Sequence, residues 1–180
     1  MLYLAAAILL ASCSLDYSAT DTEATMPESL PDTVAINITH KVHKTGRLAL
    51  LLEAGRAETY VTRKLMLLTF VHFISYDTKG ERDTEGWARY AVFHTDTENA
   101  EVSGSVYVFS AIEDADLSAE SLAWENKEKL LTAQPEELVF IRKQDGSYIS
   151  GRKFVGDFRS REVRFGGPVQ GSYVWEEKKE

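Results

Sequence analysis

The chain has 180 residues, of which 44% are hydrophobic and 27% are charged, and its formal net charge is -8 at pH 7. This length is enough for one domain with a buried core, and the charged content excludes a protein that lies mostly within a membrane. The 20 lysines and arginines form no basic block that could neutralise a row of phosphates, which argues against a nucleic-acid partner, and the single cysteine excludes an internal disulfide and a thiolate zinc site.

An apolar run covers residues 2–11 and ends in Leu-Ala-Ser-Cys at positions 10–13. Ten helical residues span about half of a ~30 Å hydrocarbon core, so the run is too short for a stable transmembrane helix and has the length of a signal-peptide core. The segment Leu10–Cys13 resembles the bacterial lipobox. This resemblance implies that residues 1–12 are a lipoprotein signal peptide and that Cys13 carries the lipid, palmitate included. The alternative is a buried apolar element with an incidental cysteine.

An acidic segment follows at residues 14–32, with five acidic residues, no basic residue and two prolines. Such a segment buries too little apolar surface to offset the entropy of ordering it, and its like charges repel one another. We therefore predict that residues 13–32 are a lipidated cysteine and a disordered spacer. A spacer of this length would hold a folded domain roughly 25 Å from the bilayer.

From residue 33 onward, apolar residues alternate with polar ones, which is typical of β-strands. Turn sequences such as Lys44–Arg47 and Asp145-Gly146 separate the runs. Residues 118–131 have a helix-forming composition, but the alternation of Leu122 and Trp124 favours a strand there as well. The sequence therefore predicts strands at residues 34–42, 48–54, 65–76, 87–94, 102–110, 117–124, 138–143 and 147–155.

A pattern of the form small-x-x-apolar occurs four times, starting at Ala54, Ala88, Ala119 and Gly151. An aromatic residue and then a second apolar strand follow each start. A period near 32 residues built of two strands predicts stacked hairpin units, each of which buries the face that its neighbour exposes. An ordinary β-sandwich with evenly spaced strands is the alternative.

Short motifs follow the spacer in a fixed order. Each is weak by itself because small, apolar and turn residues are common, but their order over residues 33–175 is more specific. They are Gly46–Leu50, Ala54–Glu58, Tyr76–Gly80, Ala88–Phe93, Val102–Val108, Leu122–Trp124 and Asp145–Gly151. In this order they resemble the LptC family of periplasmic lipopolysaccharide-export proteins, whose relative LptA shares the fold and is the nearest alternative.

The resemblance implies an all-β domain over residues 33–175: an open antiparallel β jelly roll that is V-shaped and built of stacked hairpins. It also implies a carrier without catalysis, which takes lipopolysaccharide or a related glycolipid from an inner-membrane ABC transporter of the LptB/LptF/LptG type. The lipid would pass along an apolar groove to an LptA-like partner. The implied location is the periplasmic side of a bacterial cell membrane, where the lipobox replaces the N-terminal transmembrane helix of other members. The family role favours the inner membrane, whereas Ser14 after the lipidated cysteine is typical of lipoproteins sorted to the outer membrane, so both membranes stay open.

Alternation within each strand predicts the groove lining, because residues two apart share a face. In the third unit, either Leu138 and Phe140 or Val139 and Ile141 point inward. For each predicted residue, the alternative is an ordinary core position that touches no ligand. The residues expected to line the groove are Leu50, Leu52, Val71, Phe73, Trp87, Phe93, Val106, Val108 and Trp124.

An unclosed sheet has unpaired N–H and C=O groups at both ends, and the resemblance implies that partners join there by strand addition. It places the transporter at the edge formed by residues 34–42 and the LptA-like partner at residues 163–173. Gly151 matches a family glycine at the last hairpin, where backbones approach closely. The expected partner-binding residues are Val34, Ile36, Ile38, Gly151, Val169, Gly171 and Tyr173.

The sequence has none of the motifs that mark a nucleophile elbow, a P-loop or a zinc protease. We therefore expect no catalytic residue, no metal site and no cofactor, and we expect residues 176–180 to be a solvated charged tail. A second hypothesis for function remains open, namely a periplasmic lipoprotein that binds other proteins and carries no lipid.

Overall fold

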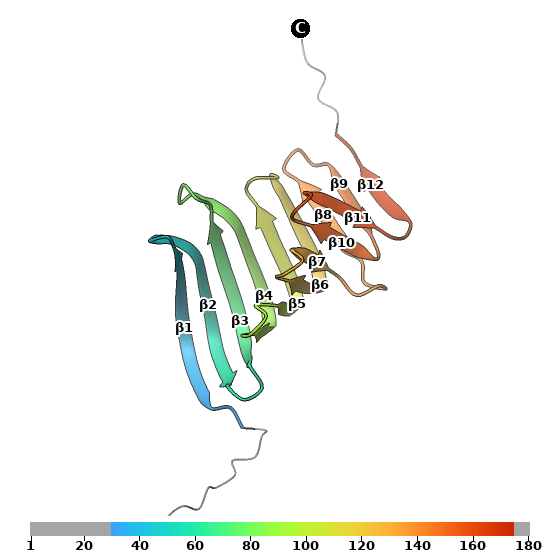
Figure 1. Cartoon of the computed structure of the whole chain (residues 1–180). Helices are drawn as coiled ribbons and strands as arrows, with labels where there is room; N and C mark the ends of the chain where they lie inside the picture. The colour runs from blue at the N-terminus through green and yellow to red at the C-terminus, as the bar shows by residue number, and fades with distance from the viewer. Residues whose placement is uncertain (1–29, 175–180) are drawn as a thin grey trace, which may run out of the picture. The chain divides into compact units, whose positions relative to one another are not determined.

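The computed structural model describes residues 30–174, and all regular secondary structure in this range is β-strand (Figure 1). Within these residues no helix is long and apolar enough to cross a membrane. The strands are β1 (Thr33–Lys44), β2 (Arg47–Tyr60), β3 (Leu65–Tyr76), β4 (Arg82–His94), β5 (Ala100–Ser110), β6 (Ala115–Glu125), β7 (Leu130–Thr132), β8 (Val139–Lys143), β9 (Tyr148–Gly151), β10 (Phe154–Asp157), β11 (Glu162–Phe165) and β12 (Val169–Ser172).

All twelve strands belong to one antiparallel sheet, in which β1 to β6 form a simple meander. Beyond β6 the strands are short and are used in pairs. β7 with β8, β10 with β9, and β11 with β12 each take the place of one long strand that is interrupted in the middle. β7 pairs with residues 123–125 of β6, while β8 pairs with residues 115–118 of the same strand. β10 pairs with β7, and β9 pairs with β8. On the far side, β11 pairs with β10, and β12 pairs with β9. The open all-β sheet that the sequence predicts is confirmed.

Two predicted strands are divided in the structure, and two others are longer than predicted: β2 continues six residues beyond the predicted end at residue 54, and β4 begins five residues before the predicted start at residue 87. The run predicted at residues 147–155 is divided into β9 and β10, because Lys153 has φ of 54°, a left-handed conformation that ends the strand. The edge predicted at residues 163–173 is divided into β11 and β12 by Gly166, Gly167 and Pro168. β7 was not predicted, since three residues are too few for alternation to identify a strand.

A line of skipped ladder positions runs across the sheet, and we call it the crease. At this line each of the strands β1 to β6 has one to three residues without a bridge partner on a neighbouring strand. Asn37, Phe70 and Ser105 have φ of 52°, 53° and 63° there, so a residue in the left-handed conformation marks the corner on every second strand. The skipped positions are Asn37, Gly55, Phe70, Arg89, Gly104, Ser105 and Glu120.

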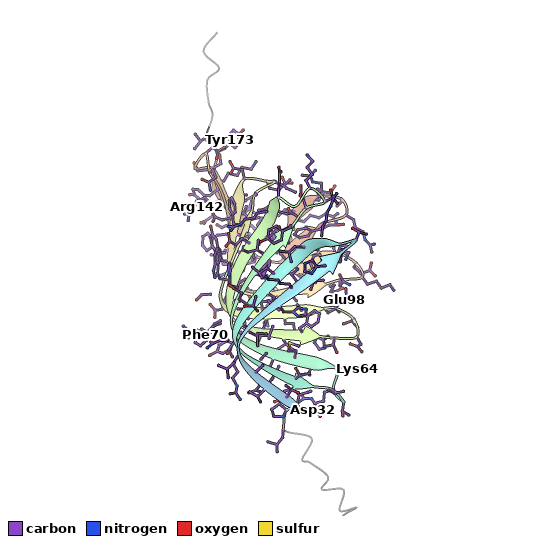
Figure 2. All side chains as sticks on the ribbon, turned by 90° about the vertical axis from the view of Figure 1, so that its left-hand side faces the viewer. Asp32, Lys64, Phe70, Glu98, Arg142 and Tyr173 are labelled. Atoms are coloured by element: carbon purple, nitrogen blue, oxygen red, sulfur yellow. The ribbon has the colours of Figure 1, made fainter. Side chains whose placement is uncertain are left out.

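The crease divides the sheet into two half-sheets that form a V. Figure 2 shows the sheet along this line, with Phe70 at the corner, Asp32, Lys64 and Glu98 on one arm, and Arg142 on the other. The first half-sheet contains residues 33–36, 56–60, 65–69, 90–94, 100–103 and 121–125 together with β7, β10 and β11. The second half-sheet contains residues 38–44, 47–54, 71–76, 82–88, 106–110 and 115–119 together with β8, β9 and β12.

The corner explains the repeated small-x-x-apolar pattern. In a straight strand, residues three apart lie on opposite faces. Across the crease, however, the partners Ala54 and Ala57 are both buried, and so are Ala88 and Ala91. The kink uses one extra residue to return the chain to the same face, so each occurrence of the pattern marks a strand that crosses the corner.

The core lies inside the V, in two clusters of buried residues. The first cluster spans β2, β3 and β4, and the second extends from β4 to β10. Val102 packs against both clusters, so they form one continuous apolar surface, which we call the inner face. The buried residues are Ala54, Ala57, Leu68, Val71 and Ala91 in the first cluster and Ala88, Val106, Leu122, Val139 and Phe154 in the second.

The crease can be tested with two glycines that share a backbone conformation. Gly104 has φ of 81°, and a Cβ added there would lie 2.7 Å from Cβ of Arg89; Gly80 has φ of 87° and no atom within 4 Å of that position. Gly80→Ala should cost only the left-handed backbone strain of about 1–2 kcal/mol. Gly104→Ala should cost at least about 1 kcal/mol more from the clash, as measured by urea unfolding. Equal losses of unfolding free energy in the two variants would show that the strands are not tightly packed at the corner.

Candidate functional site

The inner face carries an apolar row on each half-sheet, parallel to the crease. In the second half-sheet the ladder aligns Leu52, Phe73, Val108, Leu117 and Ile141 on successive strands. Gly86 occupies the β4 position of this row. A Cβ added to Gly86 would lie 2.4 Å from Cε1 of Phe73, so any larger residue would force the ring of Phe73 to move away from the backbone of β4.

The first half-sheet has a matching row on its side of the crease. Its ladder aligns Met66, Phe93, Ala100, Trp124 and Leu131 across β3 to β7. These side chains are half-buried, unlike the small buried residues at the crease itself. The V therefore has a tightly packed corner and two apolar walls that extend across most of the sheet.

The structure places eight of the nine predicted lining residues on the inner face. Leu52, Val71, Val106 and Val108 belong to the two core clusters or pack against them. The other four share the face of a clustered residue two positions away. They are Leu50, Phe73, Phe93 and Trp124.

Trp87 is the exception, since the structure places it on the outer face, and we correct that expectation here. It lies between Gly86 and Ala88, which hold the inner positions of β4, and its side chain is 42% exposed. Its ring stacks on His72 with centroids 5.0 Å apart and contacts Tyr107 with centroids 5.5 Å apart. Large apolar size suggested an inward direction, but the inner positions next to Trp87 are held by the small residues Gly86 and Ala88.

The alternative left open in the third unit is resolved by burial. Val139 is fully buried and Ile141 packs against the second cluster, while Leu138 and Phe140 are 41% and 45% exposed. Sequence reasoning missed several inner-face residues near the corner, among them Leu68, Leu122 and Phe154. The signal that locates them is the three-residue spacing across the crease, which a strict alternation rule assigns to the wrong face.

His72 ties three strands together on the outer face. Its Nδ1 lies 3.1 Å from Oε2 of Glu53 on β2, and its Nε2 lies 2.8 Å from Oε1 of Glu85 on β4. Burial alone would lower the pKa of His72, but the hydrogen bonds and charges of Glu85 and Glu53 outweigh it and raise the pKa. Arg82 adds a weaker contact, 3.7 Å from Glu85.

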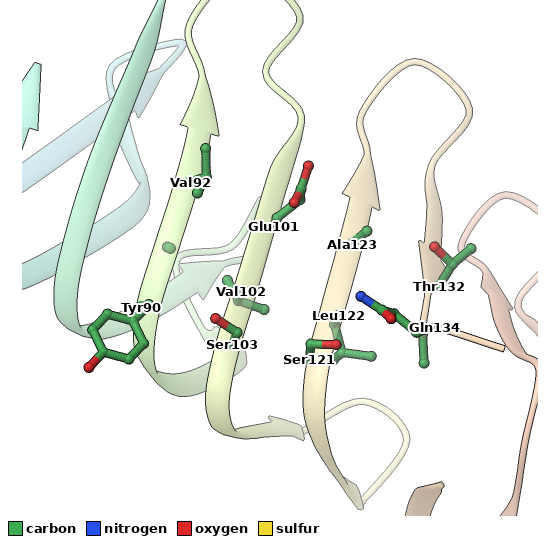
Figure 3. A pocket seen from close by; sticks show the side chains of 12 residues that line it. Tyr90, Val92, Glu101, Val102, Ser103, Ser121, Leu122, Ala123, Thr132 and Gln134 are labelled. Atoms are coloured by element: carbon green, nitrogen blue, oxygen red, sulfur yellow. The ribbon is translucent and has the colours of Figure 1, made fainter. Parts of the chain in front are cut away.

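A shallow hollow of about 400 Å³ lies over β4, β5, β6 and residues 132–134 in the first half-sheet (Figure 3). Beside it, Glu137 accepts hydrogen bonds from the backbone N and the Oγ of Ser121 at 2.5 and 2.6 Å. These bonds give the backbone N–H of Ser121 a partner in the part of β6 at the crease that pairs with neither β7 nor β8. Of the twelve residues that line the hollow, six are alanine, valine or leucine and six are polar, so its lining is mixed. The polar residues are Tyr90, Glu101, Ser103, Ser121, Thr132 and Gln134.

The sheet ends in unpaired edges on both sides. Among residues 30–174, β1 pairs only with β2, while β11 and β12 pair only with β10 and β9. Val34, Ile36 and Val169 are exposed on these edges, Gly171 lies on β12, and the exposed Tyr173 follows it. Ile38 also lies on β1 but packs against the first core cluster.

Gly151 does not lie on an edge, contrary to the expectation that it binds a partner there. It pairs with Val139 on one side and Val169 on the other, and it is buried. The close approach expected at this glycine is present, since a Cβ there would lie 2.7 Å from Cδ1 of Phe165. Within residues 30–174 no group of three His, Cys, Asp or Glu residues could hold a metal ion.

Comparison with protein families identifies the family of this chain. The family described as lipopolysaccharide-assembly, LptC-related, matches residues 2–174. The chain belongs to the LptC family. No curated protein sequence matches it. Membership of the LptC family implies a role in lipopolysaccharide transport, together with a periplasmic location at the inner membrane. Cys13 and the predicted signal peptide lie outside the described residues.

The tie at His72 predicts a pH dependence of stability. Because folding raises the pKa of His72 above its ordinary value of about 6.5, the proton is held more tightly in the folded state. The stabilisation is fully present below that pH and is lost as the pH rises through the raised pKa. Urea unfolding at a series of pH values should therefore show stability falling across this interval. His72→Gln should flatten this fall, and an unchanged slope in the variant would contradict the assignment.

Proposed function

We propose that the inner face receives the acyl chains of lipopolysaccharide or a related glycolipid and passes them along the sheet. The observation that carries this proposal is the continuous apolar surface that crosses the sheet between two unpaired edges. A closed sandwich would bury such a surface completely. Here the rows on both walls remain half-buried, which leaves apolar area for a ligand.

A protein that passes lipid onward must bind the acyl chains without trapping them, and an open V meets this requirement. Burying one CH₂ group yields about 0.8 kcal/mol, so full enclosure of a chain of about fourteen carbons would give on the order of 10 kcal/mol. That would trap the lipid. A V that covers the chains on two sides recovers only part of this energy, so a lipid can move on when the transporter supplies the next one.

The edges supply the connections in this proposal. An inner-membrane LptB/LptF/LptG-type ABC transporter would join at β1, and an LptA-like periplasmic protein would join at β12. Natural edge strands commonly carry charges that block strand addition. β12 reads Val-Gln-Gly-Ser, carries no charge and is exposed along its whole length, which supports a role in pairing with a partner.

The membrane attachment in this proposal is a lipid on Cys13. A diacylglycerol together with an amide-linked chain exceeds the two signals that durable membrane attachment requires. The acidic spacer would then set the distance between the bilayer and β1.

The lipid cargo can be tested by site-specific photocrosslinking in cells. A photoreactive residue at Phe73 faces the inner surface, whereas one at Trp87 is on the outer face of the adjacent strand. We expect lipopolysaccharide adducts at Phe73 and only background at Trp87, detected by immunoblotting for the glycolipid. Val106 should behave as Phe73 does.

The matched pair separates cargo from nonspecific contact, because both positions are aromatic and belong to the same part of the sheet. Adducts to protein alone at Phe73 and Val106 would contradict the proposal and would favour a periplasmic module that binds other proteins without lipid.

The lipid anchor has its own test. Cys13→Ala should abolish incorporation of radiolabelled palmitate and leave residues 1–12 attached, which intact mass measurement detects. Ser14→Ala should keep the label and the processed mass. Palmitate labelling that persists in the Cys13 variant would rule out this cysteine as the attachment site.

A further inference from the structure

The edge strand β1 is divided by charge at the crease. Residues 33–36 belong to the first half-sheet and include no charged side chain, whereas residues 39–44 belong to the second half-sheet and are rich in basic ones. No aspartate or glutamate occurs between residues 33 and 52, although the whole chain has a net charge of -8. We call residues 39–44 the basic half of β1. Its basic side chains, all of them exposed, are His40, Lys41, His43 and Lys44.

The basic half is protected against ordinary strand addition. Natural edge strands commonly carry lysines, because these block pairing with unrelated chains. His40 pairs with Leu52 and lies on the inner face, while Lys41 lies on the outer face opposite Leu51. An incoming strand therefore meets basic side chains on both of its faces. A register shift of the β1–β2 ladder after Val42 adds a bulge, which is a second device typical of protected edges.

The neighbouring elements do not neutralise these lysines. Among residues 30–174, neither Lys41 nor Lys44 forms an ion pair. Glu53 on β2 contacts His72 instead, at 3.1 Å. Asp77, in the turn between β3 and β4 at the same end of the sheet, accepts hydrogen bonds from backbone N–H groups of its own turn. The positive charge of the basic half is therefore available to a partner.

The other half of β1 offers apolar contact without net charge. Val34 and Ile36 are 44% and 58% exposed, and they pair with Glu58 and Arg56 on β2. The charges of these two β2 residues cancel, because Arg56 and Glu58 lie 2.7 Å apart in an ion pair. A hollow of about 250 Å³ begins at this pair and extends over β3 and β4. Its other side chains include Leu67, Thr69, Tyr90 and Val92.

We propose that β1 is a docking surface for an extended strand that is apolar opposite residues 34–36 and acidic opposite the basic half. Cross-strand pairs of opposite charge stabilise a sheet, whereas like charges directly opposite one another destabilise it. The acidic block compensates the lysines that repel other strands, and the apolar block covers Val34 and Ile36. Because the two blocks differ, they also fix the register of the partner strand. This inference rests on the proposed function, in which the transporter joins at β1, and it names the chemistry of the transporter's strand.

Charge reversal tests the acidic block. The full-length chain is titrated with the LptB/LptF/LptG-type transporter in an uncharged detergent, in which no anionic lipid is present. Lys41→Glu with Lys44→Glu should weaken binding roughly tenfold, because two attractive cross-strand pairs become repulsive. Lys127→Glu with Lys143→Glu is the matched control, since it makes the same change of charge at exposed positions in the β6–β7 turn and on β8. The control should bind as the wild type does.

Salt dependence gives a second measurement on the same complex. The affinity of the wild type should fall as sodium chloride is raised, because salt screens the attraction between exposed charges. Lys41→Gln with Lys44→Gln should lose most of this dependence. An LptA-like protein, which joins at the opposite edge in the proposed function, should bind every variant equally, and this shows that the variants are folded.

The outcomes separate this inference from the function on which it rests. A photoreactive residue at Ile36 reports whether the transporter lies at β1. Crosslinks at Ile36 together with equal affinities of the wild type and the Lys41, Lys44 reversal would overturn the acidic block. An equal loss in the Lys127, Lys143 control, or a charge effect that appears only after anionic lipid is added, would overturn it too. A wild type that forms no crosslink to the transporter at Ile36 would instead contradict the proposed function.

Discussion

The corner that each strand turns at the crease is the constraint on which the rest of the structure depends. A strand that ran straight would place alternate residues on opposite faces of a flat sheet, and neither face could enclose anything. Because Asn37, Phe70 and Ser105 adopt left-handed backbone conformations, the ladder skips a position and continues at an angle. The apolar residues on the inner side of each arm then point toward those of the other arm. The V and its inner face both follow from this local event.

Side-chain size along the strands is arranged around that corner. Alanines at positions 54, 57, 88 and 91 occupy its inside, where the two arms are closest, and larger residues such as Phe73 and Trp124 occur further out. Small residues at the vertex let the arms approach, and large residues on the walls supply apolar area. On the outer face the same strands carry polar and aromatic contacts, including the His72 tie to Glu53 and Glu85, which hold neighbouring strands in register.

Much of this organisation could be predicted from the sequence, because it depends on local patterns. Alternation located β1 to β6, and the repeated small-x-x-apolar motif marked the strands that cross the crease, although its geometric meaning was not evident. Trp87 was assigned to the wrong face because its size outweighed the alternation of Gly86 and Ala88 around it. The family resemblance places Gly151 at an edge, but β12 pairs with β9 and covers it, and alternation does not predict which strands become neighbours.

The uncharged β12 edge has a consequence for the cell. A strand that offers free backbone groups without charged side chains accepts many extended chains, including edges of other copies of the same protein. Under the proposed pairing, the amount of this protein that reaches the periplasm should therefore not exceed the amount of partner that covers the strand. Production in excess of that amount would favour self-association through β12.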